Sequence, residues 1–324
     1  MGLLDGKVAI VTGGGRGLGR AHALRMAAHG AAVVVNDPGS GLHGEATNGE
    51  PTNGEPTNGE PTNGEPTSGE QAADRPADSV AAEITAAGGR AIADYGSVTD
   101  WSATEKLVSR AVAEFGHLDI VVNNAGIIRD RMLFSMTEQD FDAVIAVHLK
   151  GTFAMTRHAC AYWRECAKRG TGRGGRIINT TSGTGLFGTV GQANYGAAKA
   201  GIISLTTITA LEMGRYGVTA NAISPIALTR MTQDIESVAG TPPPDGFDPR
   251  DPANASGLVV YLASDASAWL TGQVFRVDGR RVQRLRGWTV AGEYLSQASG
   301  AVEPGELVGA LPGMYSTAPT GRVG

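Results

Sequence analysis

Residues 7–30, KVAIVTGGGRGLGRAHALRMAAHG, place a β-branched run, a cluster of glycines and an Ala/Leu/Met-rich pattern in direct succession. The first part predicts a short buried strand, and the last part predicts a helix that ends at Gly30. Between them, TGGGRGLG (12–19) permits a tight turn whose backbone N–H groups can approach a pyrophosphate at the helix N-terminus. Many turns are rich in glycine only for packing reasons, so the surrounding sequence has to decide between the two interpretations.

The alternation of strand and helix patterns continues along the chain. Further strands are predicted at 31–37, 90–96, 118–126, 175–182 and 218–225, and helices at 77–87, 101–116, 137–170 and 193–217. Strands that alternate with helices predict βαβ units, and apolar runs such as AAVVV (31–35) are typical of a parallel sheet that is buried on both sides. We therefore expect a Rossmann-type doubly wound α/β fold, as a single domain over residues 1–280 with a C-terminal extension at 281–324.

One segment interrupts this pattern. Residues 46–70 read ATNGE-PTNGE-PTNGE-PTNGE-PTSGE and contain no large apolar side chain. Such a segment cannot bury enough apolar surface to offset the conformational entropy of folding. We interpret it as a flexible surface insertion between the second strand and the helix that follows.

The overall composition limits the classes of function. The 324 residues are 41% hydrophobic and 18% charged with a net charge of −5, so no basic field favours nucleic acid or an anionic membrane. The two cysteines, Cys160 and Cys166, are too few for a disulfide framework or a zinc site. The N-terminus lacks the features of a signal peptide, and no apolar run is long enough to span a membrane. We expect a soluble, cytoplasmic protein that binds no metal.

The predicted second strand ends in an acidic residue, Asp37, 18 residues after Gly19. A carboxylate in this position can accept hydrogen bonds from the ribose diol of an adenine nucleotide, and its charge repels a 2′-phosphate. Arg16, in the glycine-rich turn, is a contrary signal because it can pair with a 2′-phosphate. The carboxylate faces the ribose directly, so we expect NAD as the cofactor.

A tyrosine and a lysine are four residues apart in ANYGAAKAG (193–201). Positions i and i+4 share one helix face, so the phenol of Tyr195 and the ammonium of Lys199 can converge on one point. Only small residues separate them, which leaves room for a ligand nearby. Taken alone, the pair could equally lie on the surface of an ordinary helix.

Four features now occur together in one order. TGGGRGLG follows the first strand, NNAG (123–126) ends a later strand, Ser182 precedes Tyr195 by 13 residues, and Lys199 follows. In this combination the chain resembles the short-chain dehydrogenase/reductase family over about residues 5–280, apart from the repeat. The resemblance implies an oxidoreductase that interconverts a secondary alcohol and a ketone.

The resemblance also implies roles for individual residues. Tyr195 would act as general acid/base, and Lys199 would lower the phenol pKa from its usual ~10 and hold the nicotinamide ribose. Ser182 would orient the substrate oxygen, although a serine in TTSGTG (180–185) can also be a capping residue. The implied cofactor-binding residues are Gly13, Arg16, Gly17, Leu18, Gly19, Asp37, Ser97, Val98, Asn123, Ala125, Gly126, Tyr195, Lys199, Pro225 and Ile226.

Three positions depart from the family pattern. Ser97 stands where the family usually has aspartate, and Ile226 stands where it usually has glycine. His148 occupies the place of an asparagine that completes a catalytic tetrad. A lone histidine in a helix is more often a packing residue, but imidazole can also donate and accept protons in a relay. We therefore include His148 among the candidate catalytic residues.

Several stretches further resemble the dehydrogenase portion of peroxisomal-type multifunctional enzymes, which are like 17-beta-hydroxysteroid dehydrogenase type 4 and share the histidine at position 148. They include VVVNDPG (33–39), VHLKGTF (147–153) and GQANYGAAKAG (191–201). The resemblance implies a small-molecule substrate, either a (3R)-3-hydroxyacyl-CoA or a steroid-like alcohol. The CoA phosphates would be bound by a few arginines such as Arg129, Arg131 and Arg230.

Two alternatives remain open at this stage. Arg16 favours an NADPH-dependent reductase of the 3-oxoacyl carrier-protein type, and the repeat could be the arm of a non-catalytic dinucleotide-binding interaction protein. The Pro- and Gly-rich residues 231–251 are interpreted as a mobile substrate lid. Association through the helices around 138–169 and 193–214 would give a homodimer or homotetramer.

Overall fold

The computed structural model describes residues 2–45, 75–229, 231, 246–287, 290, 292–296 and 302–314. The predicted repeat insertion at 46–70 and most of the predicted lid at 231–251 lie outside the described residues. The chain forms two compact units, Met1–Arg284 and Leu285–Gly324. In the second unit the described residues include one helix, α9 (Pro304–Gly313).

The described strands form one sheet in the order β3-β2-β1-β4-β5-β6-β7-β8. The pairs from β3 to β7 are parallel. The strands are β1 (Val8–Thr12), β2 (Ala32–Asn36), β3 (Arg90–Asp94), β4 (Ile120–Asn123), β5 (Gly175–Thr180), β6 (Val218–Ile226), β7 (Val274–Asp278) and β8 (Arg281–Leu285). The chain order reverses between β1 and β4, and ligands of such sheets bind at the carboxyl ends of the strands on either side of that reversal.

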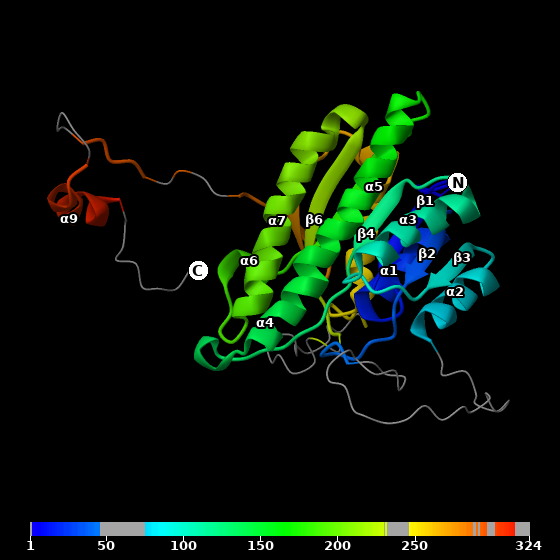
Figure 1. The fold of residues 1–324 in the computed structure, drawn as a ribbon, viewed down its shortest axis with the longest axis horizontal. Coiled ribbons are helices and arrows are strands. Elements are labelled where there is room, and N and C mark those ends of the chain that lie inside the picture. The colour runs from blue at the N-terminus through cyan, green and yellow to red at the C-terminus, as the bar shows by residue number, and fades with distance from the viewer. Residues whose placement is uncertain are drawn as a thin grey trace, which may run out of the picture. The chain divides into compact units, whose positions relative to one another are not determined.

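Helices cover both faces of the sheet, as the sequence predicted (Figure 1). Alternate residues of each strand point to opposite faces: Val8 and Ile10 pack with one core, and Ala9 and Val11 with the other. The helices are α1 (Gly17–Ala28), α2 (Pro76–Ala86), α3 (Trp101–Phe115), α4 (Glu138–Ile145), α5 (Gly151–Lys168), α6 (Gly183–Phe187), α7 (Ala193–Met213) and α8 (Ser256–Ala263).

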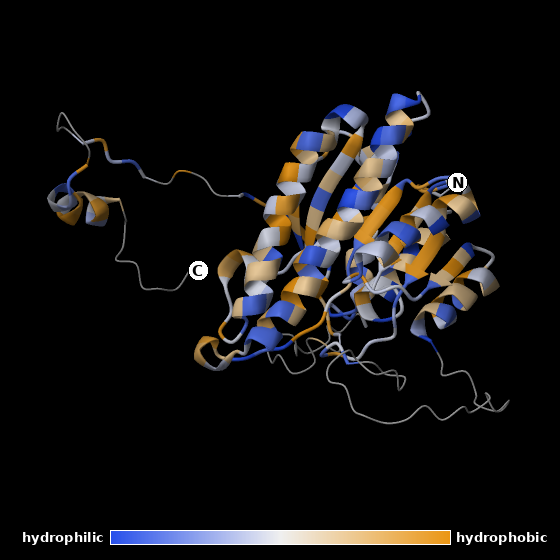
Figure 2. Cartoon of the chain, viewed as in Figure 1, coloured by the Kyte–Doolittle hydropathy of each residue, from blue (hydrophilic) through white to orange (hydrophobic). Residues whose placement is uncertain are grey.

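The two cores explain why the strand runs are almost continuously apolar. One core joins α1, α2 and α8 to the sheet through residues such as Met26 and Ile84, and the other joins α3, α5 and α7 through residues such as Met155. Figure 2 shows β1 and β2 as mainly hydrophobic ribbons between helices of mixed character. Among the described residues, no helix combines the length and the apolar character that crossing a bilayer requires.

The helix predicted over 137–170 is interrupted. It begins with a capping box, in which the Thr137 hydroxyl accepts from the backbone N–H of Asp140, and it continues as α4. A π-helical turn at Ala146–Lys150 then separates α4 from α5. Single π-helical turns of this kind are frequent at functional sites, and this one carries His148.

Candidate active site

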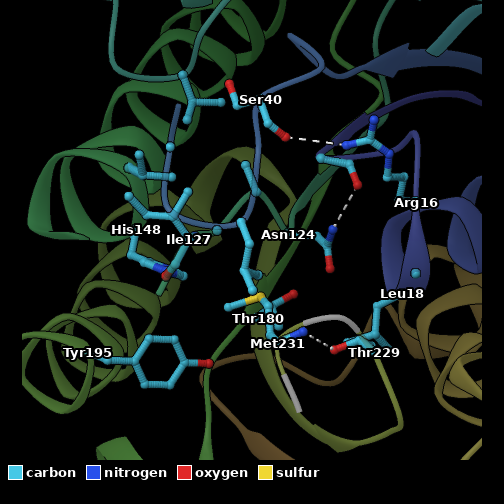
Figure 3. A pocket seen from close by; sticks show the side chains of 18 of the residues that line it. Arg16, Leu18, Ser40, Asn124, Ile127, His148, Thr180, Tyr195, Thr229 and Met231 are labelled. Atoms are coloured by element: carbon cyan, nitrogen blue, oxygen red, sulfur yellow. Dashed lines mark hydrogen bonds between the residues drawn. The ribbon is translucent and has the colours of Figure 1, made fainter. Parts of the chain in front are cut away.

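A cavity of about 570 Å³ opens at the carboxyl ends of the central strands. It extends from the glycine-rich turn before α1 to the N-terminal part of α7 (Figure 3). Its lining includes these residues named from the sequence: Gly13, Arg16, Gly17, Leu18, Asp37, Ser97, Val98, Ala125, Gly126, His148, Ser182, Tyr195, Lys199 and Pro225. The sheet thus brings together residues as far apart in the sequence as Gly13 and Pro225.

The glycine-rich turn has the geometry of a phosphate cradle. Gly13 adopts a φ of +61°, and a Cβ added there would lie 2.9 Å from Ala125 Cα. Arg16 is the N-cap of α1, and its side chain makes no capping hydrogen bond. The first backbone N–H groups of α1 therefore lack a side-chain cap. An uncapped helix N-terminus that opens on a cavity suits an anionic group such as a pyrophosphate.

The Asp37 carboxylate is oriented by two backbone N–H groups. Gly15 donates to Oδ2 at 3.0 Å, and Gly39 donates to Oδ1 at 2.8 Å. A carboxylate oxygen can accept more than one hydrogen bond, so Asp37 can still bind a hydroxyl group at the cavity wall. Arg16 donates to the carbonyl oxygen of Ser40 at 3.3 Å, so part of its guanidinium is committed to the backbone.

Among the described residues, three of the cofactor-binding residues named from the sequence do not line the cavity: Gly19, Asn123 and Ile226. Gly19 is packed inside the turn, where an added Cβ would come within 2.0 Å of Gly13 O. Asn123 points into the protein interior and donates to Asn179 Oδ1 at 2.9 Å. Ile226 ends β6, and the next residue, Ala227, lines the cavity instead.

The second asparagine of NNAG, Asn124, is the one at the cavity. Its Nδ2 donates to the carbonyl oxygens of Thr12 and Gly13 at 3.1 and 3.2 Å, and its backbone N–H donates to the Thr12 hydroxyl at 3.0 Å. Side chains alternate between the two faces of a strand, so adjacent asparagines at its end point in opposite directions. This alternation was the signal that the sequence offered. It predicts that only one of the two asparagines faces the cavity, but not which one.

Ser97 and Val98 lie in the loop between β3 and α3. The Ser97 hydroxyl forms a 2.8 Å hydrogen bond with the Thr99 hydroxyl, and Val98 is buried with its side chain against Gly151. Other cavity residues were not foreseen, because their main signal is position at a strand end. They include Pro38, Leu42, Ile127, Thr180, Thr181, Ala227 and Thr229.

Tyr195 lies in the first turn of α7, and its phenol oxygen points toward the middle of the cavity (Figure 3). Burial raises the pKa of Tyr195 to about 12, and a hydrogen bond with Ser182 opposes this rise. The Ser182 hydroxyl also caps α6 by accepting from the Thr184 N–H at 3.3 Å. Accepting that bond leaves its own hydrogen available, so Ser182 can cap the helix and still donate toward the phenol.

The Lys199 ammonium is buried under the cavity floor. Nζ donates to the carbonyl oxygen of Thr180 at 2.7 Å and lies 5.4 Å from the centroid of the Tyr195 ring. Burial lowers the pKa of Lys199 to about 7. From the sequence we expected this cation to lower the pKa of the Tyr195 phenol. In this structure burial is the largest influence on both groups, and it raises the pKa of Tyr195 and lowers that of Lys199.

His148 packs edge-on against the Tyr195 ring, with the ring centroids 5.1 Å apart. Its Nε2 lies 3.1 Å from the Ile127 backbone nitrogen and 2.8 Å from the Ile127 carbonyl oxygen, while its buried Nδ1 has no hydrogen-bond partner. Burial and the nearby charge of Lys199 lower the pKa of His148 well below its usual value, so the ring is neutral at physiological pH. Gly126 makes room for the ring, since a Cβ there would lie 2.4 Å from His148 Cε1.

The fold and the cavity together define a dinucleotide-binding α/β protein with a Ser–Tyr–Lys group beside the cleft. Residues 70–239 match the family model described as short chain dehydrogenase. The chain therefore belongs to the short chain dehydrogenase family, and it is an oxidoreductase that uses a nicotinamide dinucleotide.

Individual relatives agree with this assignment. Hydroxyacyl-CoA dehydrogenase ChsB1 of Mycobacterium tuberculosis is 46% identical over 281 residues, which are 86% of this chain and 79% of that protein. Peroxisomal multifunctional enzyme type 2 of Drosophila melanogaster is 39% identical over 298 residues, 92% of this chain and 42% of that protein. The crystal structure of a short chain dehydrogenase from Mycobacterium avium aligns with a TM-score of 0.79 at 48% identity and covers 97% of this chain and 96% of that one. The resemblance to multifunctional enzymes that the sequence suggested is thus confirmed.

The lowered pKa of Lys199 has a consequence for stability. Between its native pKa of about 7 and its ordinary value of 10.5, the unfolded chain binds more protons than the native protein, so the contribution of Lys199 to the free energy of unfolding rises with pH. Below pH 7 both states are protonated, and the cost of burying the charge is at its largest. From pH 7 to pH 9 the unfolding free energy of the wild type should therefore gain on that of Lys199→Met by on the order of 2 kcal/mol.

Urea unfolding of both proteins without cofactor, at the two pH values, measures this gain. The Lys199→Met variant serves as the reference because every other titrating group is common to both chains. A difference between the two proteins that stays constant with pH would mean that Lys199 remains protonated in its buried position.

Proposed function

We propose that the chain is an NAD-dependent dehydrogenase that interconverts a 3-hydroxyacyl thioester, or a similar secondary alcohol, and the corresponding ketone. The observation that carries the proposal is the Tyr195 phenol, which faces the same cavity as Asp37 and the uncapped N-terminus of α1. Proton transfer and dinucleotide binding can therefore take place in one cleft.

Tyr195 would take the proton of the substrate hydroxyl, and Ser182 would hold the same oxygen by a hydrogen bond. The pKa values of Tyr195 and Lys199 are both displaced by burial, which disfavours charging either group alone. A phenolate and an ammonium formed together offset this cost, because opposite charges a few ångströms apart attract strongly in a poorly solvated site. We infer that the two groups titrate as a pair that exchanges one proton with the alcohol.

The proposed role of His148 is to position its neighbours and not to carry a proton. Its neutral ring holds the backbone of Ile127 and supports one edge of the Tyr195 ring. The Nδ1 atom, buried and without a partner, is the one atom of the ring that could bind a water molecule of a proton relay.

A bound nicotinamide dinucleotide supplies the two-electron acceptor for the alcohol carbon. The residues that would hold it are the turn at Gly13–Gly17, with the helix N-terminus for its pyrophosphate, and Asp37 for its adenosine ribose. The partial commitment of Arg16 to Ser40 O weakens the case for NADP and for the alternative NADPH-dependent reductase. NAD is therefore the cofactor that we propose.

The names of the relatives support an acyl-CoA substrate. Arg129 lines the cavity, and Arg131, two residues later, is exposed, so both are candidates for the CoA phosphates. Arg230 lies outside the described residues. Exposed apolar residues on α5 and α7, Phe153, Ile208 and Leu211, also support association of copies through these helices, in line with a homodimer or homotetramer.

The decisive assay follows NADH formation spectrophotometrically with a panel of (3R)-3-hydroxyacyl-CoA thioesters and hydroxysteroids. We expect turnover by the wild type, and a kcat lower by about 10²–10⁴-fold for Tyr195→Phe with little change in NAD affinity, because only the proton-transferring oxygen is removed. Tyr95→Phe, which removes a phenol oxygen outside the cavity, is the matched control. Similar turnover by Tyr195→Phe and the wild type would refute the proposed acid/base.

The choice of dinucleotide depends on Asp37. Replacement by alanine removes the acceptor for the ribose hydroxyls and the charge that repels a 2′-phosphate, so the ratio of kcat/KM for NAD to that for NADP should fall by roughly tenfold or more. Asp142→Ala, at an exposed position of α4, should leave the ratio unchanged. A wild-type enzyme that already prefers NADP would show that Asp37 has a different role.

A further inference from the structure

The described residues that follow β2, up to residue 45, extend across the cavity. Residues 38–45, which we call the strap, follow Asp37 directly, and five of them line the cavity. These are Pro38, Ser40, Gly41, Leu42 and Gly44. A loop that ran straight back toward α2 would not face the cavity with five of eight residues.

The strap has a folded tip. The backbone N–H of Gly41 donates to Glu45 O at 2.7 Å, and the N–H of His43 donates to Glu45 Oε2 at 3.0 Å. Gly44 adopts a φ of +87°, which a side chain would disfavour. Backbone N–H donors hold the pKa of the Glu45 carboxyl below its usual range, so this residue is ionised at neutral pH and its negative charge helps to close the turn.

The tip is bonded to the loop after β4. His43 Nδ1 lies 2.8 Å from Ile128 O, and because a carbonyl only accepts, Nδ1 must carry the hydrogen. The N–H of Ile128 donates to Leu42 O at 3.2 Å, and Arg129 Nε donates to His43 O at 2.9 Å. Three hydrogen bonds therefore join this end of the strap to the β4 side of the cleft.

The other end of the strap is bonded to the opposite side. Arg16, in the glycine-rich turn, donates to Ser40 O, and Figure 3 shows this pair at the far side of the cavity from Tyr195. Gly39 donates to Asp37 at the end of β2. A segment that is bonded to both sides of a cleft forms a roof over the space between them.

We propose that residues 38–45 roof the dinucleotide cleft as a strap, and that its bonds to Ile128 and Arg129 open when the dinucleotide enters or leaves. The end of the strap at β2 is continuous with the sheet, so the end that can move is the tip. Its hydrogen bonds are exposed, so water can replace each partner at a modest net cost and the tip can open without unfolding the rest of the protein. His43 and Arg129 are thus positioning residues that set how long the dinucleotide stays bound. The inference rests on the proposed cofactor site.

The test is the release rate of NADH, measured by stopped-flow fluorescence with excess NAD as the displacing ligand. His43→Leu removes the Nδ1–H donor to Ile128 O and leaves Arg129 in place. We expect its release rate to rise by roughly fivefold, the factor that corresponds to the loss of one hydrogen bond. His43→Asn, whose amide can donate to the same carbonyl, should remain within about twofold of the wild type.

The matched control is His117→Leu. His117 also bonds to a backbone carbonyl, Gly6 O at 3.1 Å, but it lies near the amino ends of the strands and does not line the cavity. It should release NADH at the wild-type rate. Thermal unfolding of each variant checks that the chain remains folded.

These measurements distinguish a failure of the proposed strap from a failure of the proposed cofactor site. Equal release rates for His43→Leu, His43→Asn and the wild type would overturn the strap and leave the cofactor site intact. Faster release by His117→Leu to the same extent would also overturn it, because the effect would then be global. A wild-type protein that binds neither NADH nor NADPH would overturn the proposed cofactor site and the strap with it.

Discussion

A lysine ammonium is held out of water, against the backbone carbonyl at the end of a central strand and one helical turn from a tyrosine. Lys199 bonds to Thr180 O, so its position is set by β5, while its distance from Tyr195 is set by the helical repeat of α7. Burying this charge is unfavourable unless something nearby compensates it. In the mechanism that we propose, the phenolate of Tyr195 provides this compensation, which would link the cost of burying Lys199 to the ability of the site to accept a proton.

The parallel sheet makes this arrangement possible. Because the carboxyl ends of β1, β2, β4, β5 and β6 meet at one edge, the glycine-rich turn, Asp37 and the Ser–Tyr–Lys group all face one cavity. The π-helical turn between α4 and α5 brings His148 against Ile127 and the Tyr195 ring. The strap continues from β2 along the cavity wall, so in our proposal the residence of the dinucleotide and proton transfer are governed by neighbouring segments.

Much of this was predictable from local patterns. The alternation of apolar strands and helices predicted a sheet with helices on both faces. A strand that is apolar at nearly every position has apolar side chains on both faces of the sheet, and both faces must therefore be covered. The spacing of Tyr195 and Lys199 specified their common helix face. The features that were not foreseen depend on tertiary contacts. Sequence could not decide that Asn124 faces the cavity while Asn123 faces Asn179, nor that a π-helical turn divides the helix predicted over 137–170. It also did not show that burial is the main influence on the pKa of Tyr195, because burial is a property of the whole packed site.

The coupling between the two groups is tested most directly by the pH dependence of kcat/KM for oxidation of a hydroxyacyl-CoA, compared between the wild type and Lys199→Met at saturating NAD. If the ammonium stabilises the phenolate, the rise of activity with pH should occur about one pH unit or more higher in the variant, since an opposite charge this close shifts a pKa by that amount. Profiles that rise at the same pH in both proteins would contradict the pairing of Tyr195 with Lys199.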